Sequence, residues 1–118
     1  MPEIDGKTIL CTGGTGSYGQ AFVKEALKHG PKAIRVFSRG EYLQAMMRRD
    51  IPHPCLRFLI GDVRDRERLR RAMDGVDIVI HAAAMKRVES CEYDPIEACR
   101  TNVEGTANVV NAAVDAHV

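Results

Sequence analysis

The 118-residue sequence has no marked excess of either charge and no long apolar run. Its formal net charge is +1, so the overall charge indicates neither a nucleic acid nor an acidic membrane surface as a partner. No apolar segment approaches the roughly 20 residues that a membrane-spanning helix needs. The first residues, MPEIDGK, lack the basic and then apolar arrangement of a signal peptide. We therefore expect a cytoplasmic protein.

The sequence also lacks a CxxC pair, although it contains four cysteines. They are dispersed along the chain, at Cys11, Cys55, Cys91 and Cys99. This spacing is not typical of a metal site, and a cytoplasmic protein is not expected to hold disulfides. We expect the cysteines to be reduced, buried small apolar residues, and we expect no bound metal.

The composition is that of an ordinary globular protein, with 45% hydrophobic and 28% charged residues, and the length predicts one small domain over residues 1–118. Apolar runs of strand length alternate with amphipathic segments of helical length. The expected strands are Lys7–Thr12, Ala33–Ser38, Leu56–Ile60 and Asp77–Ala83. The expected helices are Ser17–His29, Glu41–Arg49, Asp65–Met73 and Pro95–Ala116. Parallel strands joined by right-handed helical crossovers predict a doubly wound, Rossmann-like α/β sheet in the order 3-2-1-4, ending before a fifth strand.

Glycines are concentrated in the segment LCTGGTGSYG, between the first strand and the first helix. Gly13, Gly16 and Gly19 stand where a dinucleotide pyrophosphate approaches a helix N-terminus in this type of fold. One glycine would form the tight turn, one would admit the phosphates, and one would let the helix pack on the strand. A P-loop is the competing interpretation, but Gln20-Ala21 occupies the place of its Lys-Ser/Thr pair. A purely structural turn is the remaining alternative.

The end of the second strand indicates which dinucleotide is bound. An acidic residue there would bind the ribose 2′-hydroxyl of NAD, but the sequence supplies Ser38 and Arg39. A hydroxyl and a cation suit a 2′-phosphate, which favours NADP over NAD. Alternatively, Arg39 is a solvated charge at a strand end.

The ends of the third and fourth strands supply further candidates. An adenine ring would meet Asp62 and lie on Val63, unless Asp62 merely caps the following helix. The small residues at the end of the fourth strand, Ala82 and Ala83, would let a ribose pass, or would serve close helix packing. Lys86 follows near the expected nicotinamide position. Two further features are interpreted as structural: His81 as a hydrogen-bonded core histidine and Arg64–Arg68 as a solvated helix face.

Six segments together resemble one superfamily: TGGTGSYG, FSRGE, IGDVRDRERL, VDIVIHAAAMKRV, CEYDP and TNVEGTANVVNAA. The superfamily is that of the extended short-chain dehydrogenases/reductases. More closely, the segments resemble its UDP-N-acetylglucosamine 4,6-dehydratases that invert C5, enzymes of surface-polysaccharide and flagellin-glycan sugar synthesis. The resemblance implies a reaction in which NADP⁺ takes a hydride from sugar C4, water leaves across C5–C6, and the hydride returns to C6.

The resemblance also implies roles for individual residues. Lys86 would lie near the nicotinamide ribose and the substrate, which makes it the candidate catalytic residue, and Asn102 would belong to a helical segment that faces the same crevice. The remaining cofactor-binding residues would be Thr15, Gly16, Ser17 and Tyr18 at the pyrophosphate, Ser38 and Arg39 at the 2′-phosphate, Asp62 and Val63 at the adenine, and Ala82 beside the cofactor.

The sequence departs from this family in two respects. After the second strand, Gly40 replaces an acidic or amide residue and Leu43 replaces a lysine, so NAD remains an alternative to NADP. The catalytic Tyr-x-x-x-Lys of the family does not occur in these 118 residues. We therefore expect a chain that binds a dinucleotide without turnover, and that would meet a UDP-sugar only within a longer protein.

Two other functions remain open, a free-standing non-catalytic nucleotide-binding module and an NADP-linked sugar epimerase or reductase. The HAAAMK segment favours the dehydratase branch. We also expect a homo-oligomer, formed through the edge of the fourth strand or through the Pro95–Ala116 helix.

Overall fold

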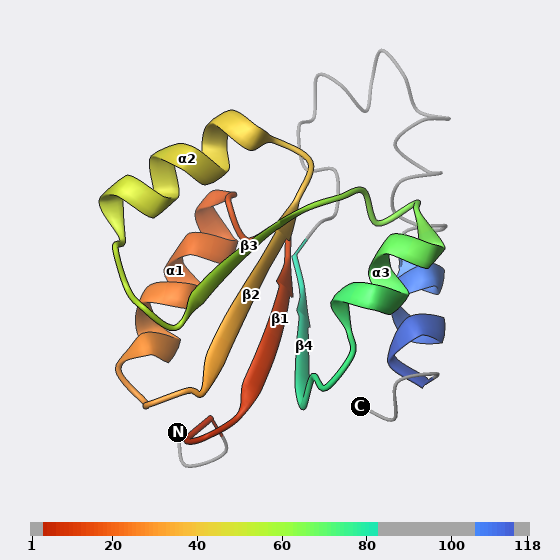
Figure 1. Cartoon of the computed structure of the whole chain (residues 1–118), viewed down its shortest axis with the longest axis horizontal. Helices are drawn as coiled ribbons and strands as arrows, with labels where there is room; N and C mark the ends of the chain where they lie inside the picture. The colour runs from red at the N-terminus through yellow and green to blue at the C-terminus, as the bar shows by residue number, and fades with distance from the viewer. Residues whose placement is uncertain (1–3, 83–105, 115–118) are drawn as a thin grey trace.

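In the computed structural model, residues 4–82 and 106–114 are described, and they form one parallel sheet between two layers of helices (Figure 1). The strands are β1 (Thr8–Thr12), β2 (Ala33–Ser38), β3 (Leu56–Ile60) and β4 (Ile78–His81), in the order β3-β2-β1-β4. This order confirms the predicted Rossmann-like topology. β1 lies centrally, where Ile9 is in register with Ile34 of β2 and with Ile78 of β4.

The two helical layers follow from right-handed crossovers on a sheet whose order reverses at β1. Helices α1 (Ser17–Leu27) and α2 (Glu41–Asp50) cover one face, and α3 (Arg66–Ala72) and the helical residues 106–114 cover the other (Figure 1). Alternate strand residues enter the two cores: Ile9 and Cys11 pack with α1 and α2, and Leu10 packs with α3.

The observed elements are slightly shorter or longer than expected. α1 ends at Leu27 rather than His29, and the chain then turns at Gly30, whose φ is +66°. α3 begins at Arg66 because the Asp65 carboxylate caps it, accepting from the Arg68 N–H at 3.1 Å. Of the expected Pro95–Ala116 helix, residues 106–114 are helical, and the part before residue 106 lies outside the described residues.

The cysteine prediction is met in part. Cys11 is fully buried in β1, and burial raises the pKa of its thiol to about 11. Cys55 is free and only half-buried, because it precedes the edge strand β3. Cys91 and Cys99 lie outside the described residues. Among the described residues, no helix has the length and apolar character to cross a membrane.

The expected oligomer surfaces are partly visible. Within the described part of the sheet, β4 pairs with β1 and forms an edge. The helical residues 106–114 carry Val110 and Val114, four residues apart on the same helix face, with 55% and 68% of their surface exposed. Homo-oligomerisation stays a prediction.

The contact of α1 with the glycine turn gives the first testable prediction, for the variant Gly19→Ala. A Cβ at this position would lie 2.5 Å from the Gly13 carbonyl oxygen and 2.6 Å from the Gly14 Cα, which are backbone atoms that cannot move aside cheaply. We expect the free energy of unfolding to fall by about 1–3 kcal/mol, measured by urea denaturation.

The matched control is Gly16→Ala, whose Cβ would meet only the Gly13 oxygen at 3.4 Å, in a backbone conformation open to alanine. Its stability should stay within about 0.5 kcal/mol of the parent chain. Equal urea midpoints for Gly19→Ala and the parent would contradict the packing argument.

Candidate functional site

The glycine turn brings the backbone of three segments together at the carboxyl end of β1. Gly13 adopts φ +68°, and its N–H donates to the Phe37 carbonyl of β2 at 2.8 Å. At Gly14 a Cβ would lie 2.7 Å from Val36 Cγ1, so the turn lies directly on β2. Gly19 places the first turn of α1 equally close to the glycine turn. These contacts hold the N-terminus of α1 over the end of the sheet.

The N-terminus of α1 offers donors that the helix itself does not use. Its N-cap, Gly16, provides no capping side chain, and the first turn contains no acidic residue. Within a helix the first amides have no carbonyl partners, and the aligned peptide dipoles make this end electropositive. The Gln20 side-chain amide donates to the Thr15 carbonyl at 2.8 Å, which ties the first turn of α1 to the glycine turn. The arrangement is suited to an anion such as a diphosphate.

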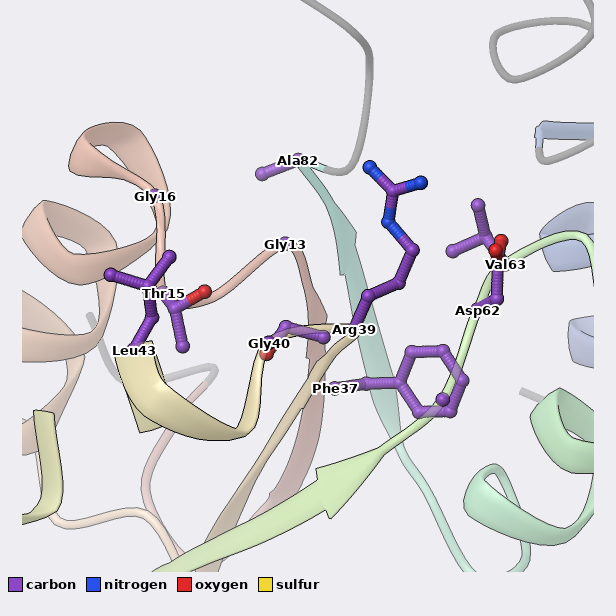
Figure 2. A pocket seen from close by; sticks show the side chains of 12 residues that line it. Gly13, Thr15, Gly16, Phe37, Arg39, Gly40, Leu43, Asp62, Val63 and Ala82 are labelled. Carbon is purple, nitrogen blue, oxygen red and sulfur yellow. The ribbon is translucent and has the colours of Figure 1, made fainter. Parts of the chain in front are cut away.

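A cavity of about 470 Å³ opens in front of this N-terminus, at the carboxyl ends of the four strands (Figure 2). Such a crevice is the usual ligand position in a doubly wound sheet. The structure brings most of the predicted site residues together in it. Those that line it are Gly13, Thr15, Gly16, Ser38, Arg39, Asp62, Val63 and Ala82.

Other predicted site residues do not line the cavity. Ser17, Tyr18 and Gly19 lie in the first turn of α1, and the Tyr18 side chain is 62% exposed. Gly19 acts in packing, as expected for the third glycine. Ala83, Lys86 and Asn102 lie outside the described residues.

Charged side chains converge on the cavity from the ends of β2 and β3. Arg39 extends from the end of β2 into it (Figure 2). Asp62 does not cap α3, since Asp65 does. Its carboxylate instead accepts from the Arg64 backbone N–H at 2.9 Å and from the Arg64 guanidinium at 2.9 Å. The sequence analysis had interpreted Arg64 as part of a solvated helix face. In the structure Arg64 instead lies before α3 and binds the Asp62 carboxylate.

The ionisation of Asp62 follows from these contacts. Partial burial disfavours its charged form, but the hydrogen bonds from Arg64 and the nearby charges of Arg64 and Arg39 outweigh burial and hold the pKa of Asp62 below its usual range. The carboxylate is therefore an acceptor at neutral pH. It is held in place by a guanidinium that is itself only about one-third exposed.

Two residues of the cavity wall, Phe37 and Gly61, were not recognised in the sequence. Gly40 and Leu43, which the sequence analysis named only as departures from the family pattern, also line the cavity. Gly61 is required there because a Cβ would lie 2.5 Å from Phe37 Cζ. Its position directly before Asp62 was the signal that could have identified it.

A further missed residue, Asn108, connects the helical residues 106–114 to Val63 at the wall of the cavity. Its side-chain amide donates to the Val63 carbonyl at 3.0 Å. The contact spans 45 positions of sequence, so no local pattern could reveal it. It ties the loop after β3 to the helix that covers the neighbouring face.

Sequence comparison identifies the family of the chain: residues 9–118 match the family described as "Polysaccharide biosynthesis protein". The chain belongs to this family. The chain is 49% identical over 110 residues to UDP-N-acetylglucosamine 4,6-dehydratase (inverting) of Campylobacter jejuni, covering 92% of this chain and 33% of that protein. It is 50% identical over 113 residues to UDP-glucose 4-epimerase of Rickettsia rickettsii, with the same coverage.

Solved structures show the same relationship. The fold superposes with a TM-score of 0.85 on dTDP-glucose 4,6-dehydratase from Streptomyces venezuelae with NAD and TYD bound. That protein is 33% identical, over 94% of this chain and 37% of the other. The resemblance to extended short-chain dehydrogenases/reductases is thereby confirmed. The chain spans about one third of the length of these relatives.

His81, the last residue of β4, connects β1 to the helical residues 106–114. Its Nδ1 lies 2.6 Å from Thr12 Oγ1, and its Nε2 lies 3.2 Å from Thr106 Oγ1. The Ala82 N–H also donates to Thr12 Oγ1, at 3.2 Å. These contacts agree with the expected hydrogen bonding of His81, but the residue is only half-buried rather than part of the core. Burial of the ring lowers the pKa of His81 below 6.5.

This lowered pKa predicts a pH dependence of stability. The unfolded chain protonates His81 near pH 6.5, whereas the folded chain resists protonation until lower pH, so the unfolded state binds more protons in this range. The contribution of His81 to the free energy of unfolding is therefore complete above pH 6.5. It is lost as the pH falls through the pKa that His81 has in the folded chain. Urea unfolding at pH 7.5, 6.5 and 5.5 should show this loss in the parent chain.

The variant His81→Gln should show a smaller loss over the same pH range, because its amide can still bond to the threonines but does not titrate. If the free energy of unfolding of His81→Gln falls as much as that of the parent between pH 7.5 and 5.5, other groups cause the acid sensitivity.

Proposed function

We propose that the chain binds NADP(H) in the 470 Å³ cavity and forms the dinucleotide-binding part of a nucleotide-sugar 4,6-dehydratase. The observation that carries the proposal is the arrangement of Arg39 and the open N-terminus of α1 around one cavity. The two positive features suit the two anionic groups of this cofactor, its pyrophosphate and its 2′-phosphate. When bound, the dinucleotide would supply a hydride acceptor.

In this proposal the pyrophosphate lies at Gly16 and the first amides of α1. A Cβ built on Gly16 would contact only the Gly13 oxygen, and Gly16 lines the cavity. The absence of a side chain at this position therefore leaves space in the cavity rather than in the core. Ser17 and Tyr18 would contribute backbone N–H groups. The glycine at this position thus permits the close backbone approach that a diphosphate needs.

The adenine would be recognised at the end of β3. The Asp62 carboxylate is ionised and therefore accepts only, which matches the exocyclic amino group of adenine. Val63 is 6% exposed and supplies an apolar wall for the ring. Arg64 holds the carboxylate, and Asn108 holds the backbone of Val63.

The preference for NADP rests on Ser38 and Arg39. Both line the cavity at the end of β2, where an acidic residue would repel a 2′-phosphate. Leu43, 48% exposed at the edge of the same cavity, offers no second cation there. The roles of Ala82 and Ala83 beside the cofactor, and of Lys86 and Asn102 near the reacting groups, are part of the proposal.

An epimerase is the second candidate function, because a Rickettsia UDP-glucose 4-epimerase is as similar to the chain as the Campylobacter dehydratase. Both activities would use the same dinucleotide cavity. The HAAAMK segment favours the dehydratase. Product analysis by NMR, with UDP-N-acetylglucosamine and UDP-glucose supplied to a longer protein that contains this chain, distinguishes a 4-keto-6-deoxy product from a C4 epimer.

The first test of the proposal is the variant Arg39→Ala. Loss of the guanidinium should weaken NADP⁺ binding about tenfold, because an ion pair with the phosphate is removed, and should leave NAD⁺ binding within about twofold. Isothermal titration calorimetry of both dinucleotides at fixed ionic strength measures the two affinities.

Two further variants serve as controls. Arg49→Ala removes an arginine that pairs with Asp50 outside the cavity, and should change neither affinity. Leu43→Lys adds a cation at the cavity edge, and should raise NADP⁺ affinity by about fivefold. If the parent chain binds NAD⁺ at least as tightly as NADP⁺, the assignment of Ser38 and Arg39 to a 2′-phosphate is wrong.

A separate prediction concerns turnover by the 118 residues alone. The tyrosines are Tyr18, Tyr42 and Tyr93, and none has a lysine four residues later. General acid–base catalysis of this kind contributes roughly 10²–10⁴-fold of rate. We expect no 4-keto-6-deoxy sugar from UDP-N-acetylglucosamine and NADP⁺, followed by NMR. Formation of this product by the chain alone would show that another group acts as the base.

A further inference from the structure

Gln44 of α2 is a buried polar side chain directly behind the cavity. Gln44 is only 3% exposed. The other buried residue of α2, Met47, is apolar and packs in the core. Its side-chain nitrogen donates to Ser38 Oγ at 2.9 Å and to the Leu59 carbonyl at 2.9 Å. Gln44 therefore connects the ends of β2 and β3 at the rim of the cavity.

The direction of these hydrogen bonds is determined by chemistry. A backbone carbonyl can only accept, so the Gln44 atom that faces the Leu59 oxygen must be the amide nitrogen. The same nitrogen faces Ser38 Oγ, which must then act as an acceptor. The hydrogen of the Ser38 hydroxyl consequently points away from Gln44.

The Ser38 hydroxyl is left as a donor that needs an acceptor. Ser38 is 9% exposed and lines the cavity, and among the described residues its hydroxyl hydrogen has no hydrogen-bond acceptor. A buried donor without a partner is costly, so native structures normally provide one. The cavity is the place from which a ligand oxygen would satisfy it.

We propose that Gln44 is a positioning residue for dinucleotide specificity, which holds the Ser38 hydroxyl as a hydrogen-bond donor to an anionic phosphate oxygen. This inference rests on the proposed function. An anionic oxygen gains more from a fixed donor than a ribose hydroxyl does, since hydrogen bonds to charged acceptors are about twice as strong. Gln44 thus favours the phosphorylated dinucleotide without touching it.

The test is a double-mutant cycle on the ratio of NADP⁺ to NAD⁺ affinity, measured by titration calorimetry on the 118-residue chain. Ser38→Ala removes the donor and should lower the ratio about tenfold. Gln44→Met keeps the side-chain volume but leaves the Ser38 hydroxyl free to rotate, and should lower the ratio about threefold. The double variant should have the same affinity ratio as Ser38→Ala, because Gln44 acts only through Ser38.

A stability control separates positioning from a merely structural effect. Met47→Val removes buried volume from the same helix and lowers the urea midpoint, but contacts neither Ser38 nor Leu59 through a hydrogen bond. Its affinity ratio should equal that of the parent. If Met47→Val and Gln44→Met lower the ratio alike, Gln44 only supports the fold, and the inference fails.

The remaining outcomes separate this inference from the proposed function. If Ser38→Ala lowers the ratio and Gln44→Met does not, the phosphate site stands and the role of Gln44 is overturned. If the affinity ratio of the double variant falls about thirtyfold, which is the product of the two single effects, Gln44 acts independently of Ser38. A parent chain that binds neither dinucleotide, or prefers NAD⁺, overturns both.

Discussion

The contact between the first turn of α1 and the glycine turn after β1 is the constraint on which the site depends. Gly19 has no room for a Cβ because the backbone of Gly13 and Gly14 lies against it. This contact sets the direction of α1, and therefore where the amides of its first turn point. It also leaves Gly16 facing open space. The same glycines thus supply close packing on one side and access for an anion on the other.

The rest of the cavity is assembled from neighbouring strand ends. In a parallel sheet the carboxyl ends of β1, β2, β3 and β4 meet at one edge, so loops far apart in sequence share one crevice (Figure 1). Residues outside the loops then fix the loop residues. Arg64 holds the Asp62 carboxylate, Asn108 holds the Val63 backbone, and Gln44 joins Ser38 to Leu59. These groups of the cavity wall are therefore held by further hydrogen bonds from α2, from Arg64 and from the helical residues 106–114, rather than by the loops alone.

Much of the fold could be predicted because its determinants are local. Apolar runs at strand spacing and amphipathic segments at helical spacing identified β1 to β4 and α1 to α3, and the crossover rule then gave the strand order. Helix ends were less certain, because they depend on caps such as Asp65, which accepts from the Arg68 N–H, whereas Asp62 accepts from the Arg64 N–H before the helix. The cavity residues Ser38, Arg39, Asp62 and Val63 were found because strand ends are recognisable in sequence.

Spacing and composition were enough to predict a crevice at the strand ends beside a glycine turn, since glycine clusters and strand ends are properties of short segments. Which partner each side chain takes was decided only when the chain folded. Gln44 meets Leu59 across 15 positions, His81 meets Thr12 across 69, and Asn108 meets Val63 across 45. Hydrogen bonds of this kind depend on the three-dimensional placement of donors and acceptors, and no periodicity in the sequence encodes that placement.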